Sequence, residues 1–162
     1  MRDFIGALVG LILAFAVYTI LGRISPALIQ LLNVFSLVVI TFAMKKDEVF
    51  GACYGAFCGL VQDSFSLGVF GVAGLAKTIL GFLAGYISKK VDVVPFFRSF
   101  LFIFTLASLE FVIWAVLYTF IFSERINTGK GLIFFQPLCT ALAGSLLIFF
   151  LRKRSRSAQF ES

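Results

Sequence analysis

The sequence predicts an all-α, polytopic membrane protein with six transmembrane helices, and three observations lead to this prediction. The chain of 162 residues is 60% hydrophobic and 14% charged, whereas an ordinary soluble domain carries about 25% charged residues. Its mean hydropathy is +1.05. Its uncharged runs reach about 20 residues, the length that a helix needs to cross a bilayer. These properties exclude a soluble globule, so we expect a single integral membrane domain over residues 1–162.

The spans follow from the positions of the charged residues. Arg23 separates the first two apolar runs, and a charged turn at 45–48 follows the second. The next apolar stretch, 49–88, is too long for one helix and divides at 64–71, where serine, glycine and aromatic residues replace aliphatic ones. A fifth run carries only Glu110, and a sixth precedes a basic C-terminal segment. The predicted spans are approximately 4–22, 26–44, 49–65, 70–88, 99–122 and 132–151.

Lysine and arginine are distributed unequally between the two sides of this six-span topology. Ten of them fall on the side that holds both termini, and Lys77 lies inside a span. The opposite side holds Arg23, Arg125 and Lys130. Because basic residues are retained in the cytoplasm, both termini are expected to be cytoplasmic.

The composition also excludes several kinds of chemistry. The chain contains no histidine, so it lacks the usual general base at neutral pH and the commonest metal ligand. Its three cysteines lie in apolar stretches without the spacing of a zinc site, and we interpret them as small packing residues. The basic residues flank apolar runs, which indicates membrane topology and not a surface for nucleic acid. We therefore predict no catalytic residue, no cofactor and no metal.

Small residues recur every four positions in three of the predicted spans. Such rows allow membrane helices to approach closely, since lipid supplies no hydrophobic drive between them. We expect another backbone against each row, from this protein or from a partner's helix. The rows are Gly6, Gly10 and Ala14 in the first span, Gly51, Gly55 and Gly59 with Asp63 in the third, and Lys77 with Gly81 and Gly85 in the fourth.

Three charged residues fall inside apolar stretches: Asp63, Lys77 and Glu110. A charge at the centre of a bilayer costs about 3 kcal/mol on insertion scales, so such a residue is expected to pair, to face a cavity or to have a function. The long side chain of Lys77 reaches either Asp63 or Glu110. The sequence leaves both pairings open, together with a site for a ligand or partner.

Two segments carry a resemblance to a known family. Residues 59–68 (GLVQDSFSLG), followed by a glycine-rich helix, resemble the central signature of the MreD family of bacterial rod shape-determining proteins. Gln136, Pro137 and Leu138, which open the last span, resemble a second signature of that family, as does the basic segment 152–156. The similarity covers the whole length of the chain.

This resemblance implies a function in bacterial cell elongation. MreD-like proteins are non-enzymatic components of the inner membrane that work with the bitopic protein MreC. Through MreC they connect to the actin-like MreB filament, RodA and a class B penicillin-binding protein, and so regulate cell shape and peptidoglycan synthesis. The implied partners are MreC, this elongation complex and membrane lipid. The fold of the family resembles the substrate-binding subunits of energy-coupling-factor vitamin transporters.

Two other functions compete with this expectation. A vitamin-binding transporter subunit needs polar and aromatic residues that converge on an outward-open cavity, and the predicted outer loops offer few of them. An intramembrane enzyme needs a paired nucleophile and base or a multi-aspartate metal motif, and the sequence contains neither pattern.

Overall fold

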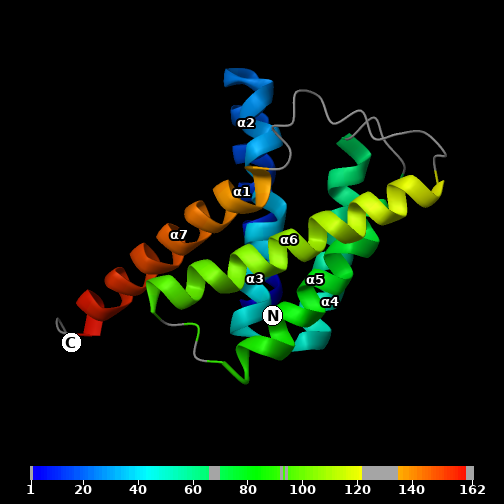
Figure 1. Ribbon diagram of the computed structural model, residues 1–162. Helices are drawn as coiled ribbons and strands as arrows, with labels where there is room; N and C mark the ends of the chain where they lie inside the picture. The colour runs from blue at the N-terminus through cyan, green and yellow to red at the C-terminus, as the bar shows by residue number, and fades with distance from the viewer. Residues whose placement is uncertain (1, 66–69, 92, 94, 122–134, 160–162) are drawn as a thin grey trace.

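The chain folds into a bundle of α-helices, seen in the computed structural model of Figure 1. The structure describes residues 2–65, 70–91, 93, 95–121 and 135–159. Within these residues there is no strand, so the predicted all-α class is confirmed. The helices are α1 (Arg2–Ile24), α2 (Pro26–Leu31), α3 (Val34–Lys45), α4 (Glu48–Phe65), α5 (Val72–Ser88), α6 (Phe96–Ile121) and α7 (Gln136–Gln159).

The long helices alternate in direction between the upper and lower ends of Figure 1. Helix α3 is the centre of the bundle, because it packs against α1, α4, α5 and α7. Helices α4 and α5 form a tightly packed antiparallel pair, and α6 crosses in front of them before α7 runs back toward the lower end. The start of α1 and the end of α7 therefore both lie in the lower half of the view.

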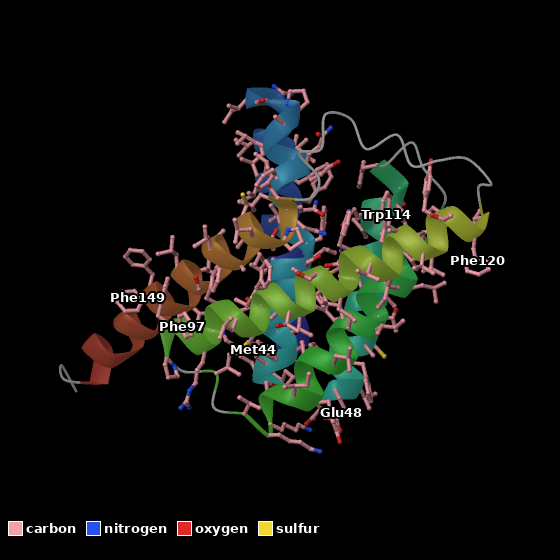
Figure 2. The ribbon with its side chains drawn as sticks, viewed as in Figure 1. Met44, Glu48, Phe97, Trp114, Phe120 and Phe149 are labelled. Atoms are coloured by element: carbon pink, nitrogen blue, oxygen red, sulfur yellow. The ribbon has the colours of Figure 1, made fainter. Side chains whose placement is uncertain are left out.

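Large apolar side chains cover the outside of the bundle. Phe97 is 69% exposed and Phe120 is 85% exposed, and both project away from the helices in Figure 2. Among the residues that the structure describes, three helical segments are long and apolar enough to cross a membrane: Ile5–Ile24, Pro26–Lys45 and Phe96–Ile121. The apolar helix Val72–Ser88 and the apolar first part of α7, Gln136–Phe150, are shorter. Helix α4 belongs neither to the long apolar segments nor to the shorter apolar ones, since its glycines, Gln62 and Asp63 lower its hydropathy.

The predicted span 26–44 coincides with the segment Pro26–Lys45, which is long and apolar enough to cross a membrane, but the chain leaves helical geometry within it at Leu32 and Asn33. Asparagine favours the position before a helix, where its side-chain oxygen accepts an otherwise unpaired backbone N–H. Asn33 Oδ1 accepts from Ser36 N at 3.3 Å and so starts α3. Helix α2 is a separate short element, capped by Ser25 and begun by Pro26.

The last two predicted spans differ from the structure at their ends. Helix α6 begins at Phe96, three residues before the predicted start of 99–122. Helix α7 begins at Gln136 and continues to Gln159, well past the predicted end of 132–151. Lysine, arginine, alanine and glutamine are good helix formers, so nothing in the basic segment ends the helix. Residues 122 and 132–134 lie outside the described part of the chain.

The glycine rows predicted for the third and fourth spans face each other across the contact between α4 and α5. A Cβ added to Gly59 would lie 2.5 Å from the carbonyl oxygen of Ala73 and 2.5 Å from Gly74 Cα. A Cβ on Gly55 would collide with the Lys77 carbonyl. Gly51 and Gly81 exclude each other's Cβ in the same way, and Gly85 lies against the Glu48 backbone. Both rows are therefore used for packing within this protein.

A group of charges joins the lower ends of the central helices. Lys89, just after α5, forms an ion pair with Asp47 at 2.9 Å and a second with Glu48 at the start of α4. The hydrogen bond from Lys89 lowers the pKa of the Asp47 carboxyl below its ordinary value. Water screens such exposed pairs, so they add little to stability.

The glycine contact predicts that one added methyl group destabilises the protein. Gly55→Ala places its Cβ on the Lys77 carbonyl, and a backbone oxygen cannot move aside without shifting α5. Overpacking of this kind costs about 1–3 kcal/mol. We expect a lower melting temperature in detergent for Gly55→Ala. Gly6→Ala is the matched control, since its Cβ would meet Phe42 at an ordinary 3.8 Å. Equal melting temperatures for the two variants would contradict the close contact between α4 and α5.

Candidate functional site

A polar cavity lies toward the upper end of the bundle, where the α2–α3 junction, the end of α4 and the start of α7 meet α5 and α6. Its volume is about 150 Å³. Charged, amide and hydroxyl groups share its wall with aromatic rings. The lining residues are Asn33, Gln62, Asp63, Ala73, Lys77, Ala107, Glu110, Phe111, Trp114, Gln136, Pro137 and Thr140.

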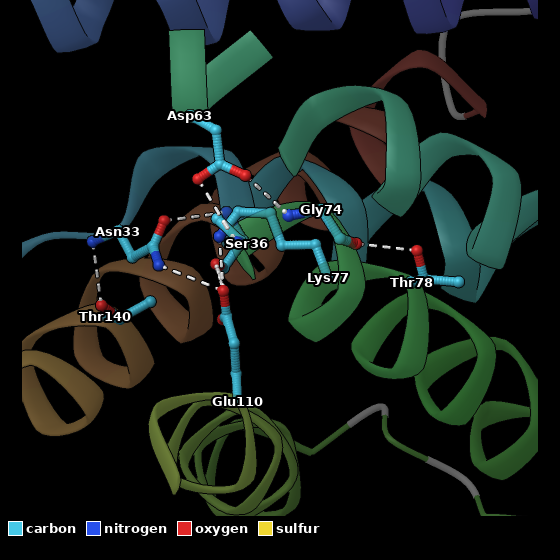
Figure 3. A network of polar contacts seen from close by, with 9 residues as sticks. Asn33, Ser36, Asp63, Gly74, Lys77, Thr78, Glu110 and Thr140 are labelled. Carbon is cyan, nitrogen blue, oxygen red and sulfur yellow. Dashed lines mark hydrogen bonds and ion pairs between the residues drawn. The ribbon is translucent and has the colours of Figure 1, made fainter. Parts of the chain in front are cut away.

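A buried ion pair between Lys77 and Glu110 forms one side of this cavity. The side chains are 1% and 7% exposed, and Lys77 Nζ donates directly to Glu110 Oε1 (Figure 3). Ser36 Oγ donates to the same oxygen at 2.8 Å, and Asn33 Nδ2 donates to it at 3.3 Å. The pair thus connects α5 with α6, and two polar residues bring α3 into the same network.

Asn33 extends the network to α7. Its backbone N–H donates to Thr140 Oγ1 at 3.1 Å, while its side chain bonds both Glu110 and the Ser36 backbone. The break between α2 and α3 exposes this N–H, which a continuous helix would use internally. The interruption that the sequence did not predict is therefore what places Asn33 at the cavity.

Asp63 has a different set of partners, although it lines the same cavity. Its Oδ2 accepts from Gly71 N at 2.9 Å and from Gly74 N at 3.2 Å, and its Oδ1 accepts from Ala73 N at 3.3 Å. The carboxylate of α4 therefore caps the first turn of α5, where unpaired N–H groups and the helix dipole favour negative charge. Gly71 has a φ of +101°, a left-handed conformation that glycine adopts without strain.

Gln136 and Pro137 reach the cavity from the start of α7. Proline is well suited to a first helical turn, because its missing N–H would have no partner there. Helix α6 contributes two aromatic rings, Phe111 and Trp114. Trp114 projects from the second half of α6 in Figure 2 and stacks on Tyr118 at a ring distance of 5.3 Å.

The structure divides the predicted site residues into two groups. Asp63, Lys77, Glu110, Gln136 and Pro137 come together around the cavity. The predicted glycines, Gly51, Gly55, Gly59, Gly81 and Gly85, form the contact between α4 and α5.

The sequence analysis missed several residues of the network and the cavity, among them Asn33, Ser36, Phe111, Trp114 and Thr140. The available signal was a neutral polar or aromatic residue inside an uncharged run. That signal is weak, because hydroxyl groups in helices commonly bond their own backbone, as Thr41 and Thr78 do here.

The arrangement is suited to binding and to holding helices together. Each described charge at the cavity has a partner: Lys77 faces Glu110, and Asp63 faces three backbone N–H groups. In the part of the chain that the structure describes, no group of three metal-binding side chains is present. No protein-family model, curated protein or solved structure matches the chain.

The buried Lys77–Glu110 pair predicts that the stability of the protein depends strongly on both residues. Lys77→Met leaves the Glu110 carboxylate buried without its counter-charge, and breaking a buried pair costs about 3–5 kcal/mol. We expect Lys77→Met to lower stability to denaturant sharply in detergent. The double variant Lys77→Met/Glu110→Met should recover part of the loss, because no lone charge remains. Lys89→Met, which removes two exposed ion pairs, is the control and should change stability little. Equal stability of Lys77→Met and the wild type would show that the pair is not structural.

Proposed function

We propose that this chain is a scaffolding membrane protein of the bacterial cell-elongation machinery, similar to MreD. It binds MreC and, through MreC, acts with MreB, RodA and a class B penicillin-binding protein to regulate cell shape and peptidoglycan synthesis. One observation carries the proposal: Asp63 and Gln136–Pro137, from the two segments that resemble this family, lie 73 residues apart and line the same cavity. If the two sequence similarities were coincidental, the two segments would not be expected to line the same cavity.

The proposed location is the inner membrane, with six spans and both termini in the cytoplasm. The alternating directions of the helices support this topology. The positions of four lysines also support it, because they lie at or just after the ends of α3 and α5, at the end of the bundle opposite the cavity: Lys45, Lys46, Lys89 and Lys90. Local thinning of the bilayer accommodates the shorter helices. The cavity then lies toward the outer side of the membrane.

A structural role agrees with the contacts of the three charged residues in the apolar stretches, which all bind other parts of the bundle. Asp63 shapes the turn into α5, and Lys77 and Glu110 hold α5, α6 and α3 in register. In this proposal the partner docks at the outer end of the bundle, where these bonds hold the helices in place. The function proposed is accordingly non-enzymatic.

A second candidate is the substrate-binding subunit of a vitamin transporter. The cavity favours it, because polar side chains and the rings of Phe111 and Trp114 converge there from five helices or helix ends. The sequence alone offered too few polar residues for such a site. The two candidates differ in what the protein retains on purification: MreC in the first case, and a small vitamin in the second.

The topology predicts the positions of two reporter fusions. A fusion at Ser66 should report an extracytoplasmic location, and a fusion at Ser162 should report a cytoplasmic one. Alkaline phosphatase and green fluorescent protein fusions measure the two sides. Finding both positions on the same side would contradict the six-span arrangement.

The scaffold proposal predicts that Asp63→Asn weakens binding to MreC. The change keeps the size and one acceptor oxygen but removes the charge that faces the α5 N-terminus, at a cost of about 1 kcal/mol. We expect less MreC to co-purify and cells to become rounder. Asp47→Asn, at an exposed carboxylate on the opposite end, is the control and should leave both unchanged. Native mass spectrometry that finds a bound vitamin and no MreC complex would favour the transporter subunit instead.

A further inference from the structure

The size of the cavity is suited to one small ring. Its volume is about 150 Å³. An apolar cavity engineered to about 150 Å³ in another protein binds benzene. The wall here is different, since polar groups occupy one side and Phe111, Trp114 and Pro137 occupy another. A ligand for such a wall has an apolar ring and a polar substituent.

The Lys77–Glu110 pair offers unused hydrogen-bonding capacity beside the cavity. A lysine ammonium has three donors, and among the described residues Lys77 Nζ donates only to Glu110 Oε1. The three described donors to Glu110, from Lys77, Ser36 and Asn33, all reach Oε1. Donor N–H groups of Lys77 and the Oε2 acceptor of Glu110 are therefore left, side by side, on residues that line the cavity.

The charges around the cavity argue against a charged ligand. Lys77 balances Glu110, and three backbone N–H groups offset the charge of Asp63. A cation or anion that entered would lose its hydration without gaining a free counter-charge, which is costly. A neutral ligand avoids this cost.

We propose that the cavity binds an uncharged planar ring that carries an amide. An amide presents a carbonyl acceptor and an N–H donor next to each other. The carbonyl accepts from Lys77 Nζ, and the N–H donates to Glu110 Oε2. The ring lies against Trp114 and Phe111, with Gln136 and Thr140 at the polar edge.

This site goes beyond the scaffold function and does not depend on MreC. In a scaffold it would make the outer end of the bundle responsive to a small molecule. In a transporter subunit the same chemistry would define the substrate class. The experiment uses the purified chain without a partner, so its failure would leave the MreC proposal standing.

Trp114 provides a direct measurement, because it is the single tryptophan of the chain and lines the cavity. The probes are benzamide, benzoate and benzamidinium, which share one shape and differ in charge. We expect benzamide to change Trp114 fluorescence saturably, with a Kd on the order of 1 mM for so small a molecule. Benzoate and benzamidinium should bind at least about ten-fold more weakly.

A pair of variants separates the cavity from the detergent micelle. Ala107→Leu extends a side chain from the cavity wall and should abolish saturation by benzamide. Ala115→Leu, on the same helix and outside the lining, should retain it. The comparison of the three probes uses the unaltered protein, so it tests the preference for an uncharged ligand even if either variant fails to fold. Tighter binding of a charged probe, or no saturable response to benzamide, would overturn the proposal.

Discussion

The ion pair between Lys77 and Glu110 is the interaction on which the rest of the bundle depends. Two charges inside an apolar protein are tolerated only when they meet each other and further hydrogen-bond partners. That requirement fixes α5 against α6 and draws Ser36 and Asn33 of the α3 region onto the same carboxylate oxygen. The Asn33 backbone then holds Thr140 of α7. One buried contact thus sets the relative positions of four helical segments.

The glycine contact between α4 and α5 makes this pair geometrically possible. Gly55 leaves room for the Lys77 backbone, so α5 packs closely against α4 inside the bundle. From this position the Lys77 side chain reaches Glu110. The same row of small residues ends in Asp63, whose carboxylate caps α5. Close packing, helix capping and charge pairing are therefore all consequences of the close contact between α4 and α5. The cavity is the space left at the upper end of this contact.

The sequence predicted the features that repeat along a helix and missed those that depend on tertiary contacts. The four-residue spacing of Gly51, Gly55 and Gly59 indicated a close approach, and a bundle of helices was evident from composition. The partner of Lys77 stayed open, because Asp63 and Glu110 were both within reach of its side chain. The break at Asn33 was missed, since hydropathy averages over a run and one polar residue changes the average little. Thr140 enters the network only through the folded arrangement of α7 on α3.

The modest hydropathy of α4 has a consequence for how the protein enters a membrane. A helix with Gln62, Asp63 and a glycine row gains little from lipid on its own, whereas α5 is more apolar and offers a complementary surface. Helices of this kind are expected to insert together as a hairpin, so that the polar face of one is covered by the other from the outset. In this view α4 and α5 form a single unit of biogenesis, which the hydrogen bonds from the start of α5 to Asp63 hold together.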